Sequence, residues 1–184
     1  MTEHLSDYYD SWRKILEIEK KFLIKELPEN LGDFDKKEIE QAYLNRNPVL
    51  RIRKSNDRYI FTYKMRKSQT DGGPLVNEEI EAPLTEEAFK HLKTKADGNV
   101  IIKTRYIIPY SSGGKEYKIE LDVFHGKLDG LVFAEVEFES EEDADSFVKP
   151  AWFGEDVSGD SRYANAFMVE LEDISVFKNK SGED

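Results

Sequence analysis

Ionisable and apolar side chains alternate along seven short stretches of this chain. In residues 16–24, for example, Glu17 and Glu19 are separated by Ile18. Side chains two positions apart share one face of a β-strand, so this alternation predicts strands with one charged and one apolar face. The same alternation recurs in residues 49–53, 58–65, 77–81, 100–108, 115–124 and 131–138.

Together the charged faces hold eight carboxylates and seven cations, with few short polar residues. The carboxylates are Glu17, Glu19, Glu79, Glu81, Glu120, Asp122, Glu135 and Glu137, and the cations are Lys21, Arg51, Arg53, Lys64, Arg66, Lys103 and Arg105. Same-sign neighbours on a strand repel each other unless the opposite sign or a ligand faces them. A closed barrel meets this condition, because about eight strands leave a lumen that holds one small ligand. We therefore predict an α+β fold, an eight-stranded antiparallel closed β-barrel (a tunnel) with a charged lumen and helices packed outside.

Charge is also segregated along the chain. Residues 46–67 hold eight basic residues and one acid, whereas residues 135–145 hold seven acids and no base. A protein with a net charge of −11 can therefore still build a cationic site. The alternative interpretation is two solvated faces of opposite sign.

Composition excludes several classes of protein. The chain has 184 residues and no cysteine, which removes disulfides, thiol nucleophiles and Cys-ligated metals. Its net charge of −11 argues against a nucleic-acid partner. No apolar run approaches the ~18 residues of a membrane span and no signal peptide is visible, so we predict a cytoplasmic protein without a membrane partner.

Helical spacing and capping residues predict the remaining elements. We expect helices at residues 3–14, at residues 35–41 (a helix or turn), after the N-caps Thr85 and Ser140, and at residues 167–176. The predicted domains are an N-terminal helical extension (1–14), a single tunnel domain (15–177) and a flexible tail (178–184). The extension could close a tunnel mouth, extend the core or join a dimer.

A lumen with charges of both signs suits a polyphosphate that binds together with a divalent metal. Arg and Lys hold phosphate oxygens, while carboxylates hold Mg²⁺ or Mn²⁺ that bridges those oxygens. Such chemistry needs no Cys, Ser or His nucleophile. The three histidines, His4, His91 and His125, are scattered and lack metal-ligand spacing.

An E-x-E-x-K motif at residues 17–21 opens an ordered series of motifs that extends over about residues 15–170. The series continues with Gln41-Ala42-Tyr43-Leu44, Leu50-Arg51-Ile52-Arg53, Thr62-Tyr63-Lys64, Glu79-Ile80-Glu81, Lys103-Thr104-Arg105-Tyr106, Asp122-Val123-Phe124-His125-Gly126, Glu135-Val136-Glu137 and residues 154–165. It resembles the CYTH domain of the triphosphate tunnel metalloenzymes, and its last part resembles the bacterial group that hydrolyses inorganic triphosphate. The resemblance implies an eight-stranded antiparallel tunnel that binds triphosphate and a divalent metal.

The resemblance also implies residue roles. Triphosphate would be bound by Lys21, Arg51, Arg53, Lys64, Lys103, Arg105 and Arg162. Mg²⁺ or Mn²⁺ would be held by Glu17, Glu19, Glu79, Glu81, Glu120, Asp122, Glu135 and Glu137. Glu17, Glu19 and Lys21 would act in catalysis, and a second metal or one of the two carboxylates would orient and deprotonate the attacking water.

Several alternatives stay open. Relatives cyclise ATP or hydrolyse thiamine triphosphate, so a class IV adenylate cyclase, a thiamine triphosphatase and a non-enzymatic polyphosphate- or nucleotide-binding module remain candidates. Two departures from the family pattern are the lack of an arginine in residues 75–77 and the 16 residues that precede Glu17. A homodimer is predicted from the family alone.

Some of these residues also have purely structural interpretations. Glu79 and Glu81 could pair with arginine or lysine across the barrel, and Arg66 could be a solvated charge. Arg162 could form a structural salt bridge, and Asn165 could tie a turn together.

Overall fold

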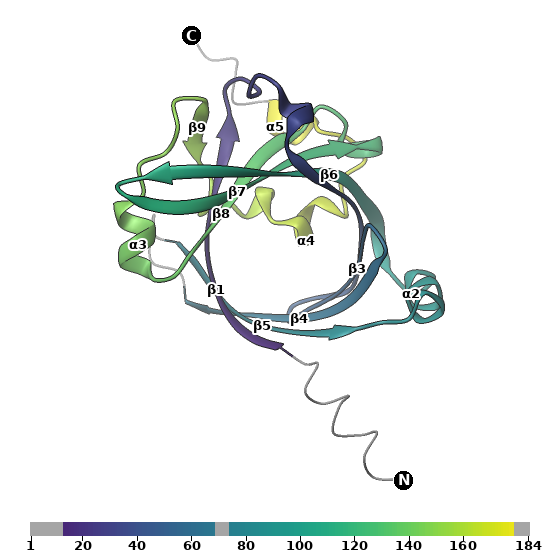
Figure 1. Ribbon diagram of the computed structural model, residues 1–184. Helices are drawn as coiled ribbons and strands as arrows, with labels where there is room; N and C mark the ends of the chain where they lie inside the picture. Colours follow the sequence, from purple (N-terminus) through teal and green to yellow (C-terminus); the bar gives the residue numbers. More distant parts are fainter. Residues whose placement is uncertain (1–12, 69–73, 179–184) are drawn as a thin grey trace.

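Nine antiparallel strands in the described part of the chain form one sheet, and eight of them close into a barrel (Figure 1). The computed structural model describes residues 13–68 and 74–178. The strands are β1 (Arg13–Ile24), β2 (Asp35–Arg46), β3 (Val49–Ser55), β4 (Arg58–Ser68), β5 (Leu75–Pro83), β6 (Asp97–Ser112), β7 (Lys115–His125), β8 (Val132–Phe138) and β9 (Phe153–Asp156). They are ordered β5-β4-β3-β2-β6-β7-β8-β1, and pairing of β1 with β5 closes the ring. The predicted eight-stranded antiparallel barrel is therefore confirmed.

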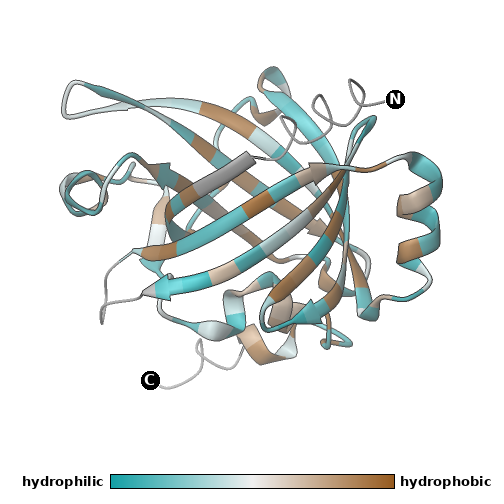
Figure 2. Ribbon diagram, turned by 90° about the horizontal axis from the view of Figure 1, so that it is seen from below, coloured by the Kyte–Doolittle hydropathy of each residue, from teal (hydrophilic) through white to brown (hydrophobic). Residues whose placement is uncertain are grey.

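Apolar side chains cover the outside of the barrel, and short helices pack on them. The α-helices are α2 (Glu86–Lys93), α3 (Glu141–Ser146), α4 (Asn165–Met168) and α5 (Ser175–Lys178), and the 3-10 helices are η1 (Leu31–Asp33), η2 (Gly126–Leu128) and η3 (Ser161–Tyr163). Figure 2 shows apolar and polar residues alternating along the barrel strands, as period-two patterning requires. One face of every barrel strand therefore points into the lumen.

The helices α2, α3 and α4 cover different parts of this wall. α2 lies on β3 and β4, where Phe89 packs with Ala42 and Ile52. α3 lies on β1 and β8, beside an aromatic cluster that includes Phe22. α4 belongs to a third cluster, in which Met168 packs with residues that include Tyr43 and Phe133.

Both helix starts that were predicted from N-caps are confirmed. The Thr85 hydroxyl accepts a hydrogen bond from the Ala88 N–H at 3.1 Å. The Ser140 hydroxyl accepts one from the Asp143 N–H, also at 3.1 Å. Each cap satisfies one of the free N–H groups of a first helical turn.

The helix or turn predicted at residues 35–41 is wrong, because these residues form the first half of β2. Residues 35–38 are all ionisable and show no alternation, yet β2 pairs with β6 from Asp35 onward and with β3 from Ile39 onward. Pairing with two neighbours therefore overrides the weak local pattern.

The single helix predicted at residues 167–176 is also wrong. α4 ends at Met168 and α5 begins at Ser175, whose N–H donates to the Asp173 carboxylate at 2.8 Å. This local turn leads into α5, which is separate from α4. β9 is a further strand that the sequence analysis did not predict.

The structure describes only part of the two terminal segments that were predicted from the sequence. Residues 13 and 14 belong to β1 rather than to the predicted N-terminal helix. The rest of that helix, and residues 179–184 of the predicted tail, lie outside the described residues. Within residues 13–68 and 74–178, no helix combines the length and apolarity that a membrane span needs.

Candidate active site

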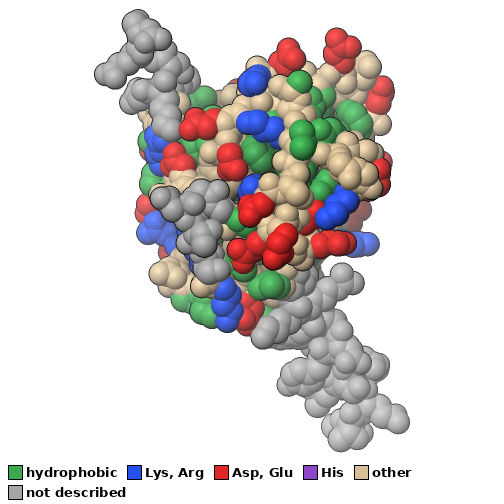
Figure 3. Space-filling model, turned by 90° about the vertical axis from the view of Figure 1, so that its left-hand side faces the viewer, with side chains coloured by type: hydrophobic (Ala, Val, Ile, Leu, Met, Phe, Trp, Pro, Cys, Tyr) green, Lys and Arg blue, Asp and Glu red, His purple; other side chains and the backbone are tan. Residues whose placement is uncertain are grey.

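A cavity of about 980 Å³ lies inside the barrel, where the charged faces of the strands meet. Thirteen of the fifteen predicted site residues line it: Glu17, Glu19, Lys21, Arg51, Arg53, Lys64, Glu79, Glu81, Lys103, Arg105, Glu120, Glu135 and Glu137. Cations from the basic stretch and carboxylates from the acidic stretch thus face the same lumen. On the outer face seen in Figure 3, by contrast, acidic, basic and apolar side chains are intermixed. The interpretation as two solvated faces of opposite sign is therefore wrong for most of the basic stretch and for Glu135 and Glu137, whereas four other acids of residues 135–145 are exposed: Glu139, Glu141, Glu142 and Asp145.

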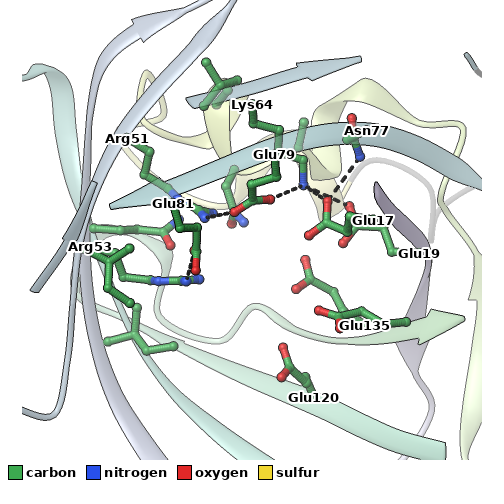
Figure 4. Close-up of a pocket in the computed structure, with 18 of the residues that line it drawn as sticks. Glu17, Glu19, Arg51, Arg53, Lys64, Asn77, Glu79, Glu81, Glu120 and Glu135 are labelled. Atoms are coloured by element: carbon green, nitrogen blue, oxygen red, sulfur yellow. Dashed lines mark hydrogen bonds and ion pairs between the residues drawn. The ribbon is translucent and has the colours of Figure 1, made fainter. Parts of the chain in front are cut away.

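One network of ion pairs joins β1, β3, β4 and β5 (Figure 4). The Lys64 ammonium donates to the Glu17 carboxylate and lies 3.7 Å from a carboxylate oxygen of Glu79. Arg51 binds Glu79 at 3.1 Å, and Arg53 binds Glu81 at 2.8 Å. Glu79 and Glu81 therefore pair across the barrel, as one of the two interpretations predicted.

A second network lies on β6, β7, β8 and β1. The Arg105 guanidinium binds both oxygens of Asp122, at 2.7 and 2.6 Å, and also reaches Glu120 and Glu135. Lys103 binds Asp122 at 2.5 Å. Asp122 is fully buried and makes these bonds from behind the cavity wall. Lys21 binds Glu135 at 2.9 Å, which joins β1 to the network.

The two buried lysines differ in how firmly they hold their protons. Burial, reinforced by the nearby Arg105 charge, lowers the pKa of Lys103 to about 8 although Asp122 opposes the shift. Burial would also lower the pKa of Lys64, but the carboxylates of Glu19 and Glu17 outweigh it and raise the pKa above its usual value. Lys64 therefore stays charged across the neutral range, whereas Lys103 has a pKa close to that range.

Negative charge is in excess where β1 and β8 face the lumen. Burial raises the pKa of Glu19, and repulsion by Glu17 and Glu135 adds to the shift against the opposing charge of Lys64. Partial desolvation at the cavity wall raises the pKa of Glu137 to about 7, with Glu120 as the next cause. An added cation would relieve this repulsion.

These carboxylates fit a divalent metal that binds together with a phosphate ligand. Among the described residues, no three carboxylates or histidines are close enough together to hold a metal ion by themselves. Mg²⁺ is commonly held by one or two carboxylates plus the phosphate oxygens of its substrate. Hard oxygen donors of this kind suit Mg²⁺ and Mn²⁺.

The raised pKa of Glu137 predicts a pH dependence of stability. Between its ordinary value of 4.5 and about 7, the folded protein binds this proton more tightly than the unfolded chain does. The contribution of Glu137 to the free energy of unfolding therefore falls as the pH rises through that window. We expect the free energy of unfolding of the wild type, relative to Glu137→Gln, to fall over this range in urea titrations without divalent metal. A pH-independent difference would contradict the shift.

Two predicted site residues do not line the cavity: Asp122, which lies behind its wall, and Arg162. The Arg162 guanidinium Nε donates to the Asp160 carboxylate at 2.9 Å, and the Asp160 side chain also accepts the Arg162 backbone N–H at 3.0 Å. Arg162 thus forms the structural salt bridge that was considered as its alternative role.

Several uncharged lumen residues were missed by the sequence analysis. β2 contributes Gln41 and Tyr43, which are buried at the cavity wall and hydrogen-bonded to each other at 3.3 Å. β5 contributes Asn77, which donates to Glu17 at 3.2 Å. The period-two spacing of Gln41 and Tyr43 was a usable signal, but the helix or turn assigned to residues 35–41 obscured it.

Comparison with known proteins agrees with this geometry. The model of the CYTH domain family matches residues 16–164. An inorganic triphosphatase of Nitrosomonas europaea is 37% identical over 157 residues, which cover 83% of this chain and 96% of the relative. An inorganic triphosphatase of Acetivibrio thermocellus is 32% identical over 161 residues, with 84% and 93% covered. The crystal structure of the inorganic triphosphatase NE1496 matches with a TM-score of 0.60 and 32% identity, over 84% of this chain and 95% of that chain.

Proposed function

This chain belongs to the CYTH domain family, and we propose that it hydrolyses inorganic triphosphate to pyrophosphate and orthophosphate inside its tunnel. Membership of the family implies a requirement for a divalent metal. Mg²⁺ or Mn²⁺ as that metal is part of the proposal. The homodimer and the cytoplasmic location remain predictions from the sequence.

Two arginines of the cavity wall have side-chain donors without a partner, and these donors are the observation on which the proposal rests. The Nε atoms of Arg51 and Arg53 are both buried and have no hydrogen-bond partner, although the Nη2 atoms of the same side chains bind Glu79 and Glu81. A buried donor left unpaired costs about 1–3 kcal/mol. Phosphate oxygens are acceptors that match the planar fork of a guanidinium, so a polyphosphate satisfies these donors.

The remaining lumen cations complete a cradle for the phosphates. Lys21, Lys64, Lys103 and Arg105 stabilise the charge that spreads over the phosphoryl oxygens during the transfer. When they bind phosphate, they give up part of their contact with the carboxylates. The carboxylates released in this way, Glu17, Glu19 and Glu135, together with Glu137 on β8, are the ones that we assign to the metal.

Each residue then has a defined part in the hydrolysis. When bound, Mg²⁺ or Mn²⁺ polarises the phosphate oxygens that it contacts. Glu19, whose pKa is raised, accepts the proton of the attacking water. The water oxygen bonds to a terminal phosphorus, and the bridging P–O bond breaks with its electron pair on the leaving pyrophosphate.

A single set of assays tests this proposal against the alternatives. The purified chain is incubated with tripolyphosphate, ATP or thiamine triphosphate, each with Mg²⁺, with Mn²⁺ or with a chelator. We expect tripolyphosphate to be hydrolysed fastest and the activity to disappear with the chelator. Cyclic AMP from ATP would indicate an adenylate cyclase, and faster hydrolysis of thiamine triphosphate a thiamine triphosphatase. Binding without any product would indicate a binding module and contradict the proposal.

A further inference from the structure

Asn165 has a side-chain oxygen that is buried without a hydrogen-bond partner, although the residue lines the cavity. The structural role predicted for Asn165 is to tie a turn together. Its Oδ1 makes no such bond within the described residues, so that role does not account for it. A buried acceptor without a donor is uncommon, and a site that is completed by a ligand or water is one reason for it.

Asn165 lies at one end of the tunnel. β3 extends along the tunnel wall for about 20 Å, at about 3.4 Å per residue. The cavity wall includes Val49 at the start of β3 and Ser55 at its end, and α4 belongs to the side-chain cluster against which Val49 packs. In Figure 1, which looks along the barrel, α4 lies over part of the opening of the ring.

The protein holds α4 firmly in this place. Val169, directly after α4, is fully buried, and its carbonyl accepts the Asn99 N–H at 2.7 Å. Gly98 has a φ of +70°, and a Cβ there would lie 2.6 Å from the same carbonyl oxygen, so only glycine allows this approach. Before the helix, the Lys21 ammonium donates to the Tyr163 carbonyl at 2.9 Å. The Asn165 amide is therefore positioned by both β1 and β6.

The chemistry of the missing partner follows from the unpaired atom. Oδ1 is an acceptor and needs a donor, which a fully ionised triphosphate does not offer. Water offers one. In an in-line displacement the attacking water lies beyond the terminal phosphorus, opposite the leaving group. For a triphosphate that lies along the tunnel, this position is at a tunnel end.

We propose that Asn165 is a catalytic residue whose side-chain oxygen accepts a hydrogen bond from the attacking water and holds it in line with the terminal phosphorus nearest α4. This inference rests on the proposed triphosphatase function. The amide takes up no proton. The water oxygen forms the new P–O bond, its proton passes to a lumen carboxylate, and the bridging oxygen leaves with the electron pair as part of pyrophosphate.

Three variants test this assignment. Asn165→Ala removes the acceptor, Asn165→Asp keeps an acceptor of the same size, and Asn45→Ala is the same substitution at a β2 position outside the cavity wall. We expect Asn165→Ala to lower kcat for tripolyphosphate about 10²-fold, because a misplaced nucleophile costs about that much. KM should stay within about twofold of the wild type, since ground-state binding is unchanged. Asn165→Asp should retain more kcat than Asn165→Ala, and Asn45→Ala should keep the wild-type kcat.

A second readout separates this role from a structural one. The rise in Tm that tripolyphosphate causes with metal present should be the same in Asn165→Ala and the wild type, because binding does not need this residue. An unchanged kcat, or a loss confined to KM and the Tm rise, would overturn the assignment. If Asn165→Ala does not fold, Asn165→Gln decides, because it keeps the amide but moves its oxygen away from the water: a fall in kcat at unchanged KM supports the assignment, and an unchanged kcat overturns it. A wild-type protein that binds tripolyphosphate without turnover would instead overturn the proposed function itself.

Discussion

Arg105→Ala is expected to abolish triphosphate hydrolysis and to lower the free energy of unfolding by about 3–5 kcal/mol. Arg105 is buried and binds three carboxylates, those of Asp122, Glu120 and Glu135. Its removal leaves these charges together in the barrel wall, with Lys103, Lys21 and Lys118 as remaining partners. The guanidinium is also a phosphate donor in the proposed cradle, so activity falls for a second reason.

Stability and activity can be separated in this experiment. Urea unfolding gives the loss of stability, and kcat/KM measured on folded protein gives the loss of activity. Adding Glu120→Gln to Arg105→Ala removes a carboxylate that would otherwise be left with only the half-exposed Lys118 as its partner, so part of the stability should return while the activity does not. Arg105→Lys keeps the charge but loses the fork that binds both oxygens of Asp122, and should be intermediate in stability. An Arg105→Ala variant of wild-type stability would contradict the account of this network.

The two-residue period of charged and apolar side chains was sufficient to predict which residues face the lumen. In the central parts of β1, β3 and β4 charged residues alternate with apolar ones, as in Glu17-Ile18-Glu19, and that local pattern decides which side chains point inward. The prediction failed for β2, because its first residues are charged on both faces and only pairing with β3 and β6 makes them a strand. A local sequence pattern does not show which strands will pair with β2.

The pairing of charges within the lumen depends on register, which the sequence does not show. Arg51 lies opposite Thr62 on β4, and Thr62 lies opposite Glu81 on β5. Arg51 nevertheless binds Glu79, two residues along β5, because the strands of a barrel are tilted and neighbours lie diagonally. The placement of α4, and with it of Asn165, depends likewise on contacts with β6 that are distant in the chain.

Glu19→Ala is expected to lower metal-dependent turnover about 10²-fold or more and to raise the metal concentration needed for half-maximal rate. Glu19 is buried among like charges, so it is a strong candidate both for the metal and for the proton of the attacking water. Its loss should barely affect the position of Lys64, which is bound more closely to Glu17 than to Glu19.

The matched control for Glu19→Ala is a carboxylate that the strand alternation points away from the lumen. Glu78 precedes Glu79 on β5, binds Lys67 at 2.7 Å and does not line the cavity, so Glu78→Ala should keep the wild-type dependence on Mg²⁺. Initial rates over a range of Mg²⁺ concentrations give both quantities for all three proteins. Glu19→Gln separates the two roles, because it keeps an oxygen ligand for the metal but cannot accept a proton near neutral pH. Unchanged turnover and unchanged metal dependence in Glu19→Ala would contradict the assignment of Glu19 to the metal site.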